Sequence, residues 1–254
     1  LTPRVSLKVN PQDMKDFSST DRNIDINNIF GINRLGLNET LESGASLTLG
    51  LDYNIQSIAN EDNYFNINMA SVFRNKEENN IPKTTTLNRK NSNLFGLINF
   101  RKSLELDNSL QKKTLNKSYF DMKYDFAIDN DLSTFEYNSI DFGFGINNFV
   151  TKFKFIEKNG EMGEINSLEN SLTYEFDENN LLTFNTRRNR KINLTEYYDL
   201  LYEYKNDCLT AGVKYKKTYY QDGDLKPTED LMFTLTIIPL TTFEQEVDQS
   251  VYRN

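Results

Sequence analysis

Apolar and polar residues alternate along most of this chain with a period of two, which is the spacing of a β-strand whose two faces meet different surroundings. In one segment Phe153 and Phe155 alternate with Lys152 and Lys154. No helical pattern of comparable length is present, although the apolar residues within 28–41 favour a short helix inside a loop. The alternation predicts an all-β protein with about twelve strands, at residues 2–9, 44–57, 62–75, 94–106, 115–128, 132–145, 148–157, 163–176, 180–190, 195–206, 209–220 and 230–240.

The predicted strands are long, and most of the links between them are short. Many strands have ten to fourteen residues, whereas strands of soluble sheets usually have about 5–6. Short polar links such as 130–131 and 206–207 indicate an antiparallel up-and-down meander. The two longest links, 10–43 and 76–93, fall at the same end of the strands, and a link at 107–114 is the longest at the other end.

Two classes of all-β protein fit this alternation. A soluble sandwich, such as an adhesin, buries one apolar face of each sheet against a second sheet. An outer-membrane barrel turns its apolar face to lipid, keeps a polar interior, and has long loops at one end with short turns at the other. The strand lengths and the sided loops favour the barrel, because a tilted membrane-spanning strand needs roughly 9–11 residues. We therefore predict a partial transmembrane β-barrel.

Composition removes several kinds of chemistry. The 254 residues include no His, which excludes Ser-His-Asp and Cys-His catalysis and His-ligated metal sites. The single Cys, Cys208, cannot form a disulfide within the chain. Lys and Arg number 29 against 37 Asp and Glu, and the net charge of −8 argues against a nucleic-acid partner. We expect no enzyme activity, no cofactor and no metal site.

Several short segments resemble the LptD family, the lipopolysaccharide-assembly proteins of Gram-negative outer membranes. Each segment is weak alone, and their order and spacing along the chain carry the resemblance. It extends over residues 1–254 and corresponds to the C-terminal half of the family's barrel. The matching segments are TPRV at 2–5, NRLG at 33–36, ESG at 42–44, FRNK at 73–76, SNLFG at 92–96, YEYKNDCLTAGV at 202–213, and the strand at 231–240 that ends in IPL.

The resemblance implies a function and a set of partners. It implies an integral protein of the cell outer membrane that inserts lipopolysaccharide into the outer leaflet through a lateral opening of the barrel. The implied partners are lipopolysaccharide, outer-membrane lipid, an LptE-type plug lipoprotein, and an LptA-type periplasmic bridge that docks on a jellyroll domain. That jellyroll domain and the first half of the barrel are expected outside residues 1–254. Cys208 is implied to bond a cysteine of the N-terminal domain, although a free Cys is more often a small buried hydrophobe.

The barrel prediction assigns candidate residues to three places. The alternation predicts that Phe149, Phe153, Phe155, Tyr198, Leu200, Tyr202 and Tyr204 face lipid. The lumen-facing candidates are Lys152, Lys154, Glu203, Lys205, Lys214 and Lys216. Candidates for binding lipopolysaccharide phosphates at the rim are Arg187, Arg188, Arg190 and Lys191, with a solvated loop as the alternative. The lateral opening is assigned to an edge strand with Leu231, Phe233, Leu235, Ile237 and Pro239.

The sequence leaves two rival functions open and excludes a third. A porin or receptor barrel that passes solutes would show the same alternation. A soluble all-β adhesin would also show it. An outer-membrane enzyme of the Ser-His lipase type is excluded, because the chain has no His.

Overall fold

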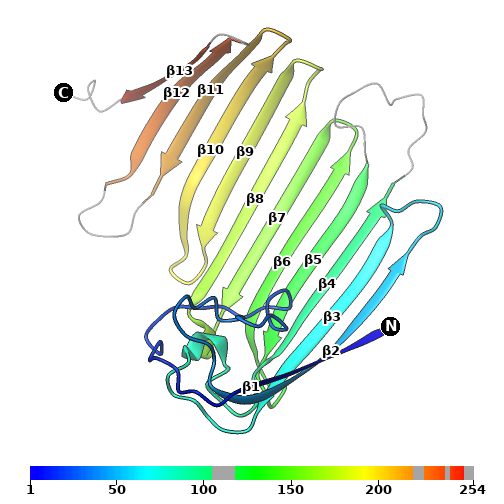
Figure 1. Ribbon diagram of the computed structural model, residues 1–254. Helices are drawn as coiled ribbons and strands as arrows, with labels where there is room; N and C mark the ends of the chain where they lie inside the picture. The colour runs from blue at the N-terminus through cyan, green and yellow to red at the C-terminus, as the bar shows by residue number, and fades with distance from the viewer. Residues whose placement is uncertain (105–117, 220–225, 238–240, 249–254) are drawn as a thin grey trace. The chain divides into compact units, whose positions relative to one another are not determined.

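The computed structural model describes residues 1–104, 118–219, 226–237 and 241–248, and for the last range only the backbone (Figure 1). These residues form one antiparallel sheet, with two short 3-10 helices at η1 (Lys83–Thr85) and η3 (Gly160–Met162). The predicted all-β class is confirmed. The strands are β1 (Thr2–Asn10), β2 (Gly44–Gln56), β3 (Tyr64–Arg74), β4 (Leu94–Ser103), β5 (Tyr119–Ile128), β6 (Phe135–Ile146), β7 (Phe149–Lys158), β8 (Ile165–Glu175), β9 (Asn180–Asn189), β10 (Leu194–Lys205), β11 (Leu209–Thr218), β12 (Thr228–Ile237) and β13 (Thr241–Asp248).

Strand order in the sheet follows sequence order from β1 to β13, as an up-and-down meander requires. The described strands number thirteen, one more than the sequence pattern predicts. The additional strand, β13, pairs antiparallel with β12. The assignment of β12 as an edge strand is therefore wrong: Leu231 and Ile237 lie on a strand with a neighbour on each side, and Pro239 lies outside the described residues.

The chain divides into two compact units. Unit 1 comprises residues 1–102, 122–140 and 156–165, and unit 2 comprises 103–121, 141–155 and 166–254.

Unit 1 has a hydrophobic core between the sheet and its two long links, residues 11–43 and 75–93. Both links leave and rejoin the strands at the same end, because Asn10 pairs with Gly44 and Arg74 pairs with Ser46. The links also bond each other, since the Phe17 amide donates to the Asn80 carbonyl at 2.9 Å. The core residues are Met14, Ile24, Ile26, Ile29, Leu35, Leu37, Ala70, Val72, Ile81, Leu87, Phe95, Leu97, Ala127 and Met162.

The first link is held by turns rather than by the short helix that its apolar residues favoured. Residues 28–41 form successive turns without helix. Asp25 Oδ1 accepts hydrogen bonds from the amides of Asn27 (2.8 Å) and Asn28 (3.0 Å), and Asn33 Oδ1 accepts one from the Leu37 amide (3.0 Å). Such side-chain acceptors compete with helical backbone bonding, so this link folds as a chain of turns.

A buried ion triad fastens the first link to β2 and β3. Both carboxylate oxygens of Glu42 accept from Arg34, at 2.7 Å from Nε and 2.5 Å from Nη2, and Oε1 also accepts from Arg74 Nη1. Arg34 Nη1 and Nη2 further donate to Thr48 Oγ1 and Ser46 Oγ, each at 3.0 Å. All three charged side chains are almost fully buried. Removing one member would leave a charge buried without its partner.

A glycine in β2 makes room for the tip of the same link. A Cβ built at Gly50 would lie 2.6 Å from Cζ of Phe30 and 2.8 Å from the carbonyl oxygen of Met69. The Phe30 ring thus rests directly on the backbone of β2. Arg4 of the neighbouring strand covers this ring at 3.9 Å from its centroid. The first link therefore packs along the strands and does not simply project from their end.

Candidate functional site

Apolar side chains of unit 2 form continuous rows across strands β8 to β12. In an antiparallel sheet, residues that pair across strands point to the same face. Leu200 and Tyr202 of β10 are 41% and 42% exposed, and Phe233 of β12 is 45% exposed. We call this side of unit 2 the apolar face. Its two central rows are Leu172–Phe184–Leu200–Tyr215–Leu231 and Tyr174–Leu182–Tyr202–Val213–Phe233.

Mostly polar side chains occupy the alternate positions and form rows on the opposite side, with Leu201 and Met232 as apolar exceptions. Asp199, which separates Tyr198 from Leu200, is only 8% exposed. We call this second side of unit 2 the polar face. Asp199 is thus buried more deeply than its apolar neighbour Leu200, the reverse of a water-soluble sheet. The corresponding rows are Ser171–Asn185–Asp199–Lys216–Asp230 and Thr173–Thr183–Leu201–Lys214–Met232.

The charges of the polar face change sign from strand to strand. Lys154 Nζ of β7 lies 3.9 Å from Asp141 Oδ1 of β6. Lys214 Nζ of β11 lies 2.8 Å from Asp199 Oδ2 of β10. Each pair joins neighbouring strands, so these ion pairs link the strands of the sheet laterally.

Arg187 of β9 bridges two carboxylates between these pairs. Its Nε atom lies 3.5 Å from Glu169 Oε1 of β8 and 2.7 Å from Glu196 Oε2 of β10. Glu196 reaches it from a bulge, because the register of β9 and β10 skips one residue between Thr195 and Tyr197. Arg187 was predicted to bind phosphate at the rim, and in the structure two carboxylates already neutralise it.

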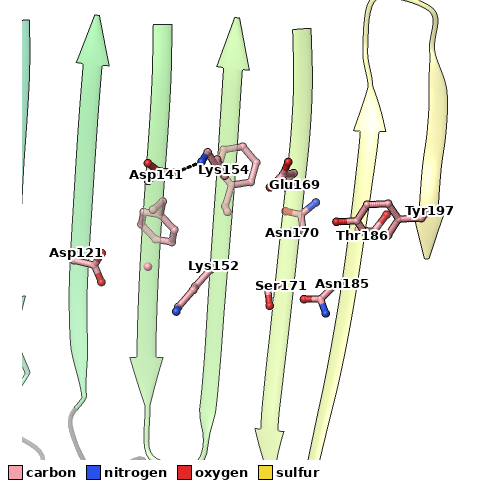
Figure 2. A pocket seen from close by; sticks show the side chains of 13 residues that line it. Asp121, Asp141, Lys152, Lys154, Glu169, Asn170, Ser171, Asn185, Thr186 and Tyr197 are labelled. Carbon is pink, nitrogen blue, oxygen red and sulfur yellow. Dashed lines mark ion pairs between the residues drawn. The ribbon is translucent and has the colours of Figure 1, made fainter. Parts of the chain in front are cut away.

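A groove of about 430 Å³ opens on unit 2 where these charges meet (Figure 2). Lys154 and Asp141 lie at one side of it, and Tyr197 with Thr186 lies at the other (Figure 2). Lys152 is exposed on the polar face of β7 and makes no ion pair within the described part of the chain. The lining residues are Asp121, Asp141, Phe142, Gly143, Lys152, Phe153, Lys154, Glu169, Asn170, Ser171, Asn185, Thr186 and Tyr197.

A second hollow of about 580 Å³ lies at the other end of β8 to β10. It contains Glu203 and Lys205, two of the lumen candidates, and five of its ten lining residues are carboxylates. Of the six lumen candidates, Lys152 and Lys154 line the groove, and Glu203 and Lys205 line the second hollow. The other two, Lys214 and Lys216, lie in the polar rows. Whether this face borders a lumen stays a prediction. The residues of the second hollow are Glu175, Asp177, Glu178, Asn179, Asn180, Leu181, Glu203, Lys205, Asn206 and Asp207.

The remaining basic residues of the rim segment do not form one cluster. Arg188 Nη2 donates to Asn193 Oδ1 within the turn between β9 and β10. The Arg190 guanidinium lies 5.5 Å from the centroid of the Phe155 ring. Arg188, Arg190 and Lys191 are exposed. Arg188 and Arg190 are thus accessible to solvent, whereas Arg187 is neutralised by its two carboxylates.

Cys208 lies in the turn between β10 and β11 with an exposed side chain. Its backbone amide donates to Asn206 Oδ1 at 3.0 Å, which shapes the turn. The expectation of a small buried residue is wrong for this thiol. Cys208 and the segment 188–191 lie at opposite ends of β10, as the strand count predicted.

The described residues contain neither a metal-binding cluster nor a helix that could span a membrane. Within ranges 1–104, 118–219 and 226–237, His, Cys, Asp and Glu side chains form no group that could hold a metal ion. Neither 3-10 helix, nor any other described helical segment, has the length and apolarity needed to cross a membrane. No protein-family model and no curated protein sequence matches the chain.

Proposed function

We propose that this chain forms part of the wall of an outer-membrane β-barrel that inserts lipopolysaccharide into the outer leaflet. The observation that supports this most directly is the polarity of unit 2. Monomeric soluble proteins rarely expose contiguous apolar rows of this kind, because their apolar patches are usually small. Lipid on the apolar face and water on the polar face would satisfy both sides of such a sheet.

The cargo and partners rest on the resemblance to the LptD family. The resemblance supports lipopolysaccharide as cargo, with a plug lipoprotein and a periplasmic bridge as partners. The exposed turn at Cys208 supports the interdomain disulfide, because an exposed thiol is accessible to a partner cysteine. A porin-type barrel is the rival, and it predicts solute flux without lipopolysaccharide contact.

The facing of the sheet can be tested with single tryptophans, because the chain has none of its own. Leu200→Trp places the probe on the apolar face, and Leu201→Trp places it on the polar face one residue further along β10. In vesicles that contain brominated phospholipid, fluorescence at position 200 should be quenched strongly and at 201 weakly. Equal quenching at both positions would refute a membrane-spanning sheet.

The cargo can be tested by photo-cross-linking in the cell envelope. A benzophenone amino acid at Asn185, on the polar face, should yield an adduct with lipopolysaccharide that grows under active synthesis. The matched control position is Phe184, which directly precedes Asn185 in β9 and lies on the apolar face. Conductance in planar bilayers with no adduct at 185 would instead support the porin.

A further inference from the structure

The groove of Figure 2 carries polar groups that wall formation alone does not require. Its floor depends on Gly143 of β6. A Cβ at this position would lie 2.4 Å from Oδ1 of Asp121, so the glycine lets the Asp121 carboxylate lie across the neighbouring strand. Asp121 makes no ion pair within the described residues, and neither does Lys152. Two opposite charges thus remain available on one floor.

The charges around the groove disfavour a ligand with a strong charge of its own. A phosphate that approached Lys152 and Lys154 would also meet the carboxylates of Asp121, Asp141 and Glu169. A bare cation would meet the two ammonium groups. For an ion in the groove, attraction to the groups of opposite charge is therefore largely offset by repulsion from the groups of like charge.

An uncharged polyhydroxylated ligand can use every one of these groups. A hydroxyl both donates and accepts, so it can donate to a carboxylate and accept from an ammonium group at the same time. The amide of Asn185 and the hydroxyl of Ser171, which pair across β8 and β9 on the polar face, add further donors and acceptors. The ring of Tyr197 closes one side (Figure 2) and offers an apolar surface for the C–H groups of a sugar ring.

We propose that this groove binds a neutral glycan segment longer than one sugar residue, because neighbouring strands lie about 4.8 Å apart and the groove extends from β5 to β10. One sugar contacts Asp121, Asp141, Lys152 and Lys154 through its hydroxyls, and a following sugar packs against Tyr197. The volume of about 430 Å³ lies within the usual range of small-molecule sites. The inference rests on the proposed function in one respect, because it needs the polar face to be open to water.

The purified protein in detergent micelles allows a direct test by saturation-transfer NMR. The probes are the methyl glycosides of glucose, galactose and mannose, with inorganic phosphate as the charged competitor. At least one glycoside should bind, and phosphate should not displace it. Asp141→Asn and Lys152→Gln should each weaken binding about tenfold, which corresponds to about 1.4 kcal/mol.

The matched controls are Glu203→Gln and Lys205→Gln, which make the same charge changes in the second hollow. Both should bind the glycoside like the parent protein. Lys152→Gln is the variant least able to disturb folding, because Lys152 is exposed and makes no ion pair within the described residues. Binding that is absent for all three glycosides, unchanged in the groove variants, or displaced by phosphate would overturn the proposal. If quenching still places Leu200 in lipid, that result removes the sugar site and leaves the membrane wall intact.

Discussion

Asp199 and Leu200 are consecutive residues of β10, and the aspartate is buried while the leucine is exposed. Asp199 is held by Lys214 on the polar face, and Leu200 lies between Phe184 and Tyr215 on the apolar face. The free energy of transfer from water favours the opposite arrangement for an isolated sheet. An apolar phase on the side of Leu200, as the proposed function supplies, would make this arrangement favourable.

The two faces should respond differently to the same added charge. Phe184→Arg puts a guanidinium into an apolar row, and Thr183→Arg puts one on the polar face of the same strand. Near the middle of a bilayer, the first change should destabilise the folded protein by about 2–4 kcal/mol, because the charge must enter hydrocarbon. Urea unfolding in lipid vesicles measures this cost. Equal losses for the two variants would contradict the assigned facing.

The buried triad should be the most sensitive ion cluster of unit 1. Glu42→Gln leaves Arg34 and Arg74 without their shared carboxylate and should lower the free energy of unfolding by about 3–5 kcal/mol. The control is Glu39→Gln, which breaks an exposed pair with Lys15 and should change stability little. Chemical denaturation with both variants checks the contrast, and a similar small effect at position 42 would show that the triad does not fix the link.

Acid should weaken the second link of unit 1 through Glu78. The Ser43 hydroxyl donates to Glu78 Oε2 at 2.5 Å, and this hydrogen bond holds the pKa of Glu78 below its usual value of 4.5. A carboxyl group whose pKa is lower in the folded state than in the unfolded state stabilises the fold at pH values above its unfolded pKa. This stabilisation is lost as the pH falls through the folded pKa.

Ser43→Ala should therefore destabilise the protein at neutral pH, and the difference from the parent should shrink in acid. Unfolding curves at a series of pH values from neutral to strongly acidic measure it. Ser57→Ala is the control, because its hydroxyl accepts only from the Asn60 amide and should give a pH-independent effect. A difference for Ser43→Ala that stays constant with pH would argue against this role of Glu78.

Cys208 should carry an intermolecular or interdomain disulfide in the native protein. Its side chain is exposed in a short turn, and disulfides persist in an oxidising periplasm. Non-reducing electrophoresis of the protein as made in its cell should differ in mobility from the Cys208→Ser variant. Identical mobility, together with complete alkylation of native Cys208, would show a free thiol.

The sequence could predict the meander because apolar and polar residues alternate within each strand. Predicted and observed strands agree closely from β1 to β12, for example 44–57 against Gly44–Gln56. β13 was missed because TTFEQEVD contains only Phe243 and Val247 as large apolar residues. A strand at the end of the sheet can gain backbone hydrogen bonds without an apolar pattern.

The loop core and the groove could not be predicted, since both depend on contacts between distant residues. Arg34 and Arg74 are 40 positions apart, and nothing in their neighbours shows that they share Glu42. Nor does the sequence show that Arg187 is neutralised, because Glu169 and Glu196 reach it from two other strands. Long-range register decides such pairings, and short motifs carry little information about it.

The bulge at Glu196 has a consequence for how β10 tolerates changes in length. On the turn side of the bulge Thr195 lies opposite Arg188, and on the other side Tyr197 lies opposite Arg187. One surplus residue is thus absorbed between these pairs, and the rows from Tyr197 to Tyr204 keep their phase. The change in register caused by an insertion or deletion in the turn at 190–193 should be absorbed at this bulge. The residues of β10 after the bulge should then keep their faces. The bulge therefore separates a turn segment that tolerates changes in length from a strand segment whose side chains keep a fixed alternation between the two faces.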